Sequence, residues 1–191
     1  MKPVKKQNIK ALTETAILTA MTVVLSFIKI VPLPLGGSVT LFSMLPLCVL
    51  SVRRGVKWGL SGGIVYAVIK LMLNLGEIIS WGLTPAALIG CMLFDYLIAF
   101  TVIGLAGCLR THGRAGILGG TAFALFLRFC SHLISGVFIF DAWVPEGWAN
   151  PFVYSVAYNG AFMLPELLMV VLALFFLTKT AAFREILGEQ Q

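Results

Sequence analysis

The sequence predicts an all-α integral membrane protein with six transmembrane helices and both termini in the cytoplasm. Of its 191 residues, 59% are hydrophobic and 12% are charged, whereas soluble domains carry about 25% charged residues. A soluble core of this length would leave large apolar patches exposed, so we expect the bilayer to be the solvent. The mean hydropathy of +0.98 agrees with this. We predict a single transmembrane domain covering residues 1–191.

The first two predicted helices cover residues 11–31 and 39–52. Lysines precede the first segment as in a signal peptide, but its apolar stretch is about 20 residues long and lacks a small-residue cleavage site. We therefore expect it to be retained as a helix. Prolines and glycines between residues 32 and 37 end it. The second segment is the weakest of the six, because it is short and contains Pro46.

The other four predicted helices cover residues 58–75, 83–109, 115–140 and 153–178. Charged and turn-forming residues separate these segments, at 53–55, 76–82, 111–114 and 145–151. Each segment is close to the length of about 20 apolar residues that crosses a bilayer. An even number of crossings places both termini on the same side.

The positive charges fall on one side of the predicted membrane. They are Lys2, Lys5, Lys6 and Lys10 before the first helix, Arg53, Arg54 and Lys57 in the second loop, Arg110 and Arg114 in the fourth, and Lys179 and Arg184 after the sixth. The opposite loops contain acidic residues but no Lys or Arg. Because short cytoplasmic loops collect basic residues, both termini are expected in the cytoplasm. The net charge of +6 therefore reflects topology, and we expect no nucleic-acid partner.

The sequence contains no motif for a metal, a cofactor or ATP. Cys48, Cys91, Cys108 and Cys130 stand singly, without the spacing of a zinc site or a redox pair, and are expected to act as apolar filler. A phosphate-binding loop is also absent. Any ATP-driven work must therefore be done by a partner subunit.

Polar side chains gather at membrane depth in the last three segments. They are Asp95 and Tyr96 in the fourth, Arg128, His132, Gly136 and Phe140 at four-residue steps in the fifth, and Tyr154, Ser155 and Asn159 near the outer end of the sixth. Ionisable groups are costly in a bilayer and indicate a functional site. An acid, a base, an imidazole, an amide and aromatic rings together suit a small, flat, polar ring compound. A cationic ligand would be attracted by Asp95 and by the aromatic faces.

Two other interpretations of this polar set stay open. In the first, Asp95 pairs with Arg128 in an internal hydrogen-bond network of a structural or channel-forming subunit. In the second, the protein is an intramembrane enzyme in which His132 acts as a base with Ser131, Ser135 or Asp95. The H-E-x-x-H motif is absent, and Ser131 and Ser135 lie only one and three residues from His132 on the same helix, which speaks against the enzyme.

Other residues of the apolar segments and of the outer loops have simpler explanations. Lys29 and Lys70 lie toward the outer ends of their helices and are expected to snorkel to the interface. Trp81, Trp143 and Trp148 are expected at the outer membrane interface, with a lid over the pocket as the alternative.

Small residues four apart predict close contacts between helices. The pairs and runs are Ala16 and Ala20, then Gly55, Gly59 and Gly63, then Gly116 and Gly120. The glycines are expected to pack inside the bundle.

Motifs along nearly the whole chain support a resemblance to a known family. They are LTETAILTA, GGSVTLFSMLPL, SVRRGVKWGLSGG, FDYLIAFTVIGLAGCLR, LRFCSHLISGVFIF and VYSVAYNGAFMLPE. The combination of H-x-x-x-G with Y-S-x-x-x-N after a tryptophan-containing loop is the most specific. The chain resembles the substrate-binding S components of energy-coupling factor (ECF) vitamin transporters, most closely the thiamine-specific family.

The resemblance implies a six-helix S-component-type bundle in the cell membrane, which binds thiamine near the outer face without catalysing a reaction. Its partners would be a transmembrane coupling subunit and two cytoplasmic ATPase subunits. Another vitamin, a thiamine precursor or a related heterocycle remains an alternative ligand. In the family, a helix face of the A-x-x-x-A type contacts the coupling subunit, and Ala16 and Ala20 match it. Residues 32–38 correspond to a lid.

The resemblance also implies roles for the polar set. Asp95 and Tyr96 match an acid–tyrosine pair, whose carboxylate is expected to bind the aminopyrimidine. The fifth-helix match is Arg128, His132 and Gly136, and the sixth-helix hydrogen-bonding match is Tyr154, Ser155 and Asn159. The family has a stacking tryptophan near Phe140, so Phe140 or Trp143 is expected to stack on the ligand here.

Overall fold

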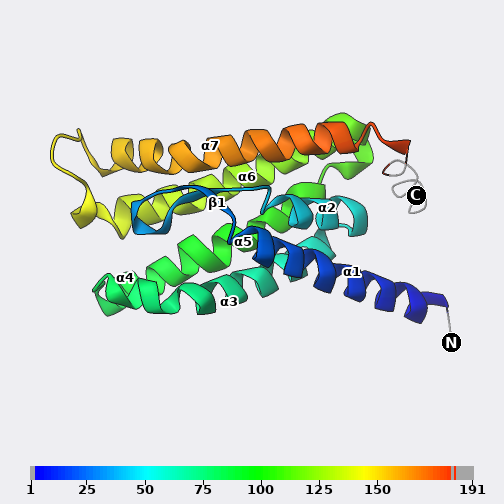
Figure 1. Ribbon diagram of the computed structural model, residues 1–191, viewed down its shortest axis with the longest axis horizontal. Helices are drawn as coiled ribbons and strands as arrows, with labels where there is room; N and C mark the ends of the chain where they lie inside the picture. The colour runs from blue at the N-terminus through cyan, green and yellow to red at the C-terminus, as the bar shows by residue number, and fades with distance from the viewer. Residues whose placement is uncertain (1–2, 182, 184–191) are drawn as a thin grey trace.

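The structure, a computed structural model, describes residues 3–181 and residue 183. It is mostly helical (Figure 1). The long helices are α1 (Pro3–Leu25), α3 (Val56–Ser80), α6 (Gly113–Phe138) and α7 (Pro151–Leu177), and α2 (Leu45–Arg54) is shorter. A continuous helical stretch between α3 and α6 consists of α4 (Pro85–Cys91), the π-helix η2 (Met92–Ile98), α5 (Ala99–Thr101) and the 3-10 helix η3 (Val102–Gly107). Single 3-10 turns form η4 (Arg110–His112) and η5 (Asp141–Trp143).

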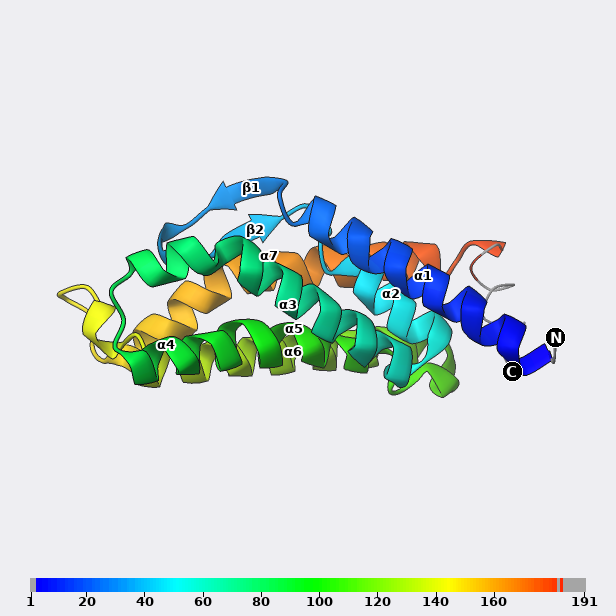
Figure 2. The same cartoon turned by 90° about the horizontal axis from the view of Figure 1, so that it is seen from below.

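A short antiparallel hairpin connects α1 to α2. Its strands are β1 (Lys29–Pro32) and β2 (Ser38–Thr40), joined through the 3-10 turn η1 (Pro34–Gly36). The register pairs Lys29 with Thr40 and Pro32 with Ser38. Figure 2 shows the hairpin beyond the end of α1, on one side of the helical bundle.

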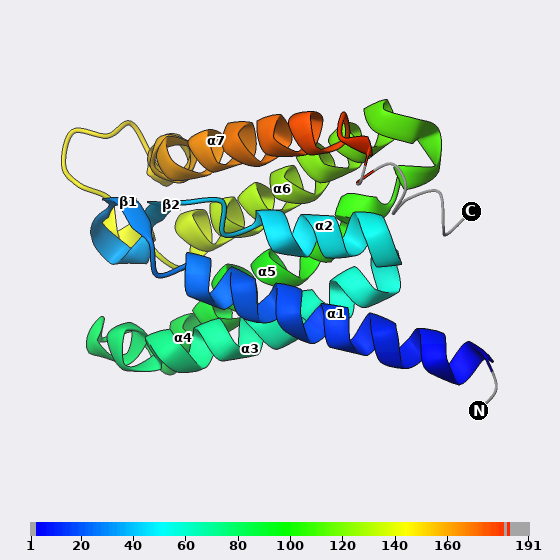
Figure 3. The same cartoon turned by 45° about the vertical axis from the view of Figure 1, so that its right-hand side comes forward.

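The helices run along the long axis of the molecule, so their connections collect at its two ends. One end carries the start of α1, the α2–α3 junction, η4 and the end of α7 (Figure 1). The other end carries the α3–α4 connection, η5 and the start of α7. Helix α2 packs against α1, α3, η3 and α7 and thus lies inside the bundle (Figure 3).

Four helical stretches of the described chain are long and apolar enough to cross a membrane. They are Gln7–Leu25, Val56–Ser80, Pro85–Phe138 and Pro151–Leu177, the third of which contains both the α4–η3 stretch and α6. Helix α2 has 10 residues, fewer than the roughly 20 needed to span a bilayer. The protein is therefore a helical membrane protein.

Several helix ends differ from the limits expected from the sequence. The first helix runs from Pro3 to Leu25 instead of from residue 11 to residue 31, and β1 occupies Lys29–Pro32. The second helix begins at Leu45 instead of residue 39, since β2 occupies Ser38–Thr40. Pro46 falls in the first turn of α2, where a missing N–H costs little.

The inner face of α1 is polar and its outer face is apolar. Thr15, Thr19 and Thr22 are buried, whereas Ile17 and Met21 are exposed. The hydroxyls of Thr15 and Thr22 bond within their own helix, to the carbonyl oxygens of Ala11 at 2.8 Å and Leu18 at 3.1 Å. A soluble helix has the opposite pattern, and an apolar outer face is what lipid contact requires.

Glycines bring the helices close together in the half of the bundle that holds η3. A Cβ atom on Gly104 would lie 2.3 Å from the Leu60 backbone nitrogen, and one on Gly59 would lie 2.6 Å from the Gly104 carbonyl oxygen. Ser51 of α2 donates a hydrogen bond to that oxygen and accepts one from Gly107 N at 2.9 Å. As predicted, Gly59 and Gly63 of α3 pack inside the bundle.

Candidate ligand-binding site

A pocket lies between the hairpin, α3, the α4–α5 stretch, α6 and α7. The sequence-predicted residues that line it are Asp95, Tyr96, Arg128, His132, Gly136, Phe140, Tyr154, Ser155 and Asn159. The other predicted residue, Trp143 of η5, is exposed and lies outside the lining. The polar residues singled out on three predicted helices thus line a single cavity in the fold.

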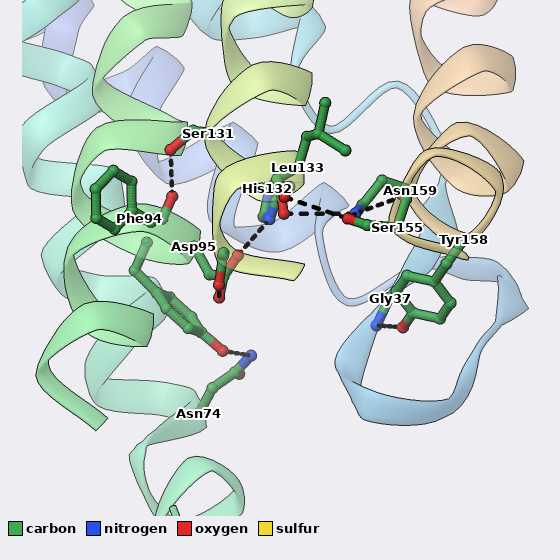
Figure 4. Close-up of polar contacts among 12 residues, drawn as sticks. Gly37, Asn74, Phe94, Asp95, Ser131, His132, Leu133, Ser155, Tyr158 and Asn159 are labelled. Atoms are coloured by element: carbon green, nitrogen blue, oxygen red, sulfur yellow. Dashed lines mark hydrogen bonds and ion pairs between the residues drawn. The ribbon is translucent and has the colours of Figure 1, made fainter. Parts of the chain in front are cut away.

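The carboxylate of Asp95 is held by two side chains of α6. Asp95 Oδ1 lies 2.8 Å from His132 Nδ1 (Figure 4). Asp95 Oδ2 accepts a hydrogen bond from the Ser135 hydroxyl. A carboxylate has about four lone-pair sites, so Asp95 can still accept hydrogen bonds from a ligand. The pairing of Asp95 with Arg128 that we considered from the sequence is absent, because the axial position of α6 brings His132 level with Asp95.

The other ring nitrogen of His132 is available to a ligand. Since a carboxylate oxygen only accepts, Nδ1 carries the proton in the bond to Asp95. Nε2 is buried and has no hydrogen-bond partner among the described residues. Such an orphaned polar atom in a pocket wall requires an explanation, and a hydrogen-bonding ligand provides one.

Asp95 and Tyr96 lie on the π-helix η2. Adjacent residues of an α-helix diverge by about 100°, but the wider turns of a π-helix reduce this angle, so both side chains can line the pocket. Ser131 of α6 donates a hydrogen bond to the Phe94 carbonyl oxygen (Figure 4). The phenolic oxygen of Tyr96 lies 3.2 Å from Asn74 Nδ2 on α3. Short π-helices frequently occur at functional sites.

Arg128 forms a buried ion pair with Glu166 of α7. Arg128 Nη1 lies 2.7 Å from Glu166 Oε2, and the two side chains are 7% and 5% exposed. The other carboxylate oxygen accepts hydrogen bonds from the backbone N–H and the hydroxyl of Thr40 on β2. Glu166 is the one charged residue within α7, and no role for it is predicted from the sequence.

The start of α7 contributes aromatic and amide groups. Tyr154 and Tyr158 stack with ring centroids 5.8 Å apart. Asn159 Nδ2 donates to the Ser155 carbonyl oxygen at 2.9 Å. A Cβ atom on Gly136 would lie 2.2 Å from Ser155 Oγ, so the glycine is what permits α6 and α7 to approach here.

The hairpin forms one wall of the pocket and contacts α7. Gly37 N donates to the Tyr158 hydroxyl at 3.2 Å (Figure 4). That hydroxyl in turn donates to the Pro34 carbonyl oxygen. Gly36, Gly37 and Thr40 line the pocket. The segment expected to act as a lid therefore lies against the candidate site.

Four further lining residues come from α3 and its C-terminal end: Tyr66, Lys70, Asn74 and Trp81. Trp81 meets Phe140 edge to face at 5.7 Å between centroids. Lys70 Nζ lies 3.4 Å from Ser26 Oγ. Lys70 and Trp81 are expected at the membrane interface from the sequence, since residue spacing along one helix does not show which other helices that helix contacts. Within residues 3–181 and 183, no group of three His, Cys, Asp or Glu side chains could hold a metal ion.

The fold and the site define a helical membrane protein with a pocket of paired ionic, amide and aromatic groups. A sequence profile of the family described as "Thiamine transporter protein" matches residues 12–184. The chain belongs to this family.

Individual relatives agree with the family assignment. The chain is 30% identical over 190 residues to "Thiamine transporter ThiT" of Bacillus subtilis, with 91% of this chain and 94% of the relative covered. It is 29% identical over 170 residues to "Thiamine transporter ThiT" of Lacticaseibacillus paracasei, with 81% and 79% covered. The solved structure of ThiT from Listeria monocytogenes has the same fold, with a TM-score of 0.71 at 22% identity and coverage of 95% and 98%.

Proposed function

We propose that this protein is the thiamine-binding S component of an ATP-driven ECF vitamin uptake transporter and catalyses no reaction itself. The family and the two named relatives support a thiamine ligand and a transport role rather than a catalytic one. The observation that carries the proposal is the carboxylate of Asp95, fixed by His132 and Ser135 in a pocket with aromatic walls.

The chemistry of thiamine matches that of the pocket. Its exocyclic amine can donate a hydrogen bond to Asp95, since carboxylates favour N–H donors. Its pyrimidine ring can stack on the wall formed by His132 and Phe140, since aromatic faces favour flat rings. Its positively charged thiazolium ring is attracted by aromatic faces, such as those of Tyr154 and Tyr158. The remaining predicted contacts, from Tyr96, Arg128, Gly136, Ser155 and Asn159, surround the same space.

The membrane topology we propose has six crossings, made by α1, α2 with the hairpin, α3, the α4–η3 stretch, α6 and α7. The α2–α3 junction, η4, and the end of α7 lie at one end of the bundle with the start of α1 (Figure 1). The basic residues of the loops occur in these segments, and basic loops face the cytoplasm. Both termini are then cytoplasmic, and the hairpin and η5 lie toward the outer side of the cell membrane.

The partner proposed for α1 is a transmembrane coupling subunit that carries two cytoplasmic ATPase subunits. Leu12, Ala16, Ala20 and Val24 follow at four-residue steps and are all exposed. Small side chains allow helices in lipid to pack closely. Ala16 and Ala20 therefore leave a shallow place on α1 against which a partner helix can fit.

Calorimetric titration of the detergent-purified protein with thiamine tests the ligand, with riboflavin and biotin as controls. We expect saturable binding of thiamine only. In Asp95→Asn the affinity should fall roughly 10- to 150-fold, because hydrogen bonds to charged groups contribute about 1.5–3 kcal/mol. The matched control is Asp141→Asn, which changes an exposed carboxylate outside the pocket and should bind like the wild type.

The outcomes separate the ligand from the site. Wild-type protein that shows no heat of binding with thiamine but binds another heterocycle would refute thiamine as the substrate. Equal thiamine affinities in Asp95→Asn and wild type would remove Asp95 from the binding site while leaving the ligand in place.

A further inference from the structure

Glu166 is a buried acid whose two oxygens are both engaged. It lies in α7 and is 4% exposed. One oxygen lies 2.7 Å from Arg128 Nη1, and the other accepts the Thr40 N–H at 3.0 Å as well as the Thr40 hydroxyl. The Thr40 hydroxyl is in turn 2.6 Å from Ser43 Oγ. The carboxylate is thus fixed between α6 and the hairpin, with hydrogen-bond donors at both oxygens.

Arg128 depends on this carboxylate for charge compensation. Its side chain lies in the pocket wall and is 7% exposed, and Glu166 is its one ion-pair partner in the described part of the chain. Its guanidinium carbon lies 5.3 Å from the ring centroid of Phe100. Arg128 Nε is buried and makes no hydrogen bond to another described residue. Without Glu166, a full positive charge would remain in the wall of the pocket.

The charged groups around the pocket balance one another. Lys70 and Arg128 are basic, whereas Asp95 and Glu166 are acidic, and all four line the cavity. His132 bonds to Asp95 through Nδ1. Neutralising Glu166 would therefore change the net charge of the four pocket-lining residues from zero to positive. In a site shielded from water, such an unbalanced charge acts strongly on a charged ligand.

We propose that Glu166 is a specificity-determining residue, which cancels the charge of Arg128 and so allows the pocket to accept a positively charged heterocycle. This inference rests on the proposed function, because thiamine carries its positive charge on the thiazolium ring. At an effective dielectric constant of about 20, a unit charge roughly 6 Å away changes the binding of a cation by on the order of 100-fold. The same charge leaves a neutral molecule of equal shape nearly unaffected.

Two ligands of equal shape and different charge test the proposal. Thiamine is compared by calorimetry with its thiophene analogue, in which carbon replaces the thiazolium nitrogen and the positive charge is lost. We expect Glu166→Gln to lower the ratio of thiamine affinity to analogue affinity by roughly 10- to 100-fold. Glu146→Gln, which removes an exposed carboxylate of the loop after η5, is the matched control and should keep the wild-type ratio.

Arg128→Gln provides the opposite change and a second variant in case Glu166→Gln does not fold. This variant leaves the negative charge of Glu166 without the positive charge of Arg128, so the ratio of thiamine affinity to analogue affinity should rise. Equal losses for both ligands in Glu166→Gln, or an unchanged ratio in either pocket variant, would overturn the inference while thiamine binding by the wild type stands. Wild-type protein that binds neither ligand would instead overturn the proposed function, and this inference with it.

Discussion

His132 of α6 and Asp95 of the π-helix η2 are joined by a hydrogen bond of 2.8 Å between Nδ1 and Oδ1. The imidazole thereby orients the carboxylate, and its own Nε2 is left without a partner among the described residues. Ser135 holds the second carboxylate oxygen from the next turn of α6. Two adjacent turns of one helix thus position an acid that belongs to another, which prepares the acceptor before a ligand arrives.

Replacing His132 by Ala should weaken thiamine binding by roughly 10- to 150-fold, because the change removes both Nε2 and the bond that orients Asp95. Combining it with Asp95→Asn in a double-mutant cycle should give a loss smaller than the sum of the single losses, as expected for residues in direct contact. Calorimetry on the four proteins measures both quantities. Strictly additive losses would show that the two side chains act independently.

Gly136→Ala should weaken binding and lower stability. The added Cβ would lie 2.2 Å from Ser155 Oγ, so α6 and α7 must separate, and overpacking of this kind costs about 1–3 kcal/mol. Gly119→Ala on the same helix is the matched control, since a Cβ atom there would have no neighbouring heavy atom within 4 Å among the described residues. Thermal unfolding and calorimetry compare the two variants. Equal behaviour of the two variants would contradict the role we give to Gly136.

Tyr158→Phe should speed the release of thiamine while leaving the ring stack with Tyr154 in place. The hydroxyl accepts from Gly37 N at 3.2 Å and donates to the Pro34 carbonyl oxygen, so it ties the hairpin to α7. Losing two neutral hydrogen bonds, each contributing about 0.5–1.5 kcal/mol, should raise the dissociation rate by roughly 5- to 150-fold. Stopped-flow tryptophan fluorescence measures this rate. If only the association rate changed, the hydrogen bonds between the Tyr158 hydroxyl and the hairpin would not be what slows thiamine release.

Part of the pocket lining could be predicted from the sequence because helical spacing shows which side chains share a face. Arg128, His132 and Gly136 recur at four-residue steps and all line the pocket. Spacing along one helix does not fix how far that helix is shifted against its neighbour. A shift of four residues is about 6 Å, which is the difference between pairing Asp95 with Arg128 and pairing it with His132.

Other parts of the site depend on contacts between distant segments. Glu166 gains its role from Arg128, 38 residues earlier, and from Thr40, 126 residues earlier. A lone acid in an apolar helix was the available signal for it. The π-helix carrying Asp95 and Tyr96 has no comparable signal, since its wider turn is supported by neighbours such as Ser131, which bonds to the Phe94 carbonyl oxygen. The hairpin replaced expected helix ends because Pro32 and Pro34 favour extended and turn conformations.

Ala20→Trp should abolish thiamine uptake without changing thiamine binding. Ala20 lies on the exposed face of α1 together with Ala16, and neither residue lines the pocket; exposed substitutions change stability by about 0.5 kcal/mol or less. A tryptophan at this position would hold a partner helix away from the small-residue surface. Leu168→Trp, at a position of α7 that is 52% exposed, is the matched control for bulk on a lipid-facing helix.

Uptake of labelled thiamine into vesicles containing the full transporter, measured beside calorimetry on the isolated protein, separates transport from binding. Normal uptake by Ala20→Trp would exclude this face of α1 as the docking surface, and loss of uptake in both variants would show that any added bulk impairs the transporter.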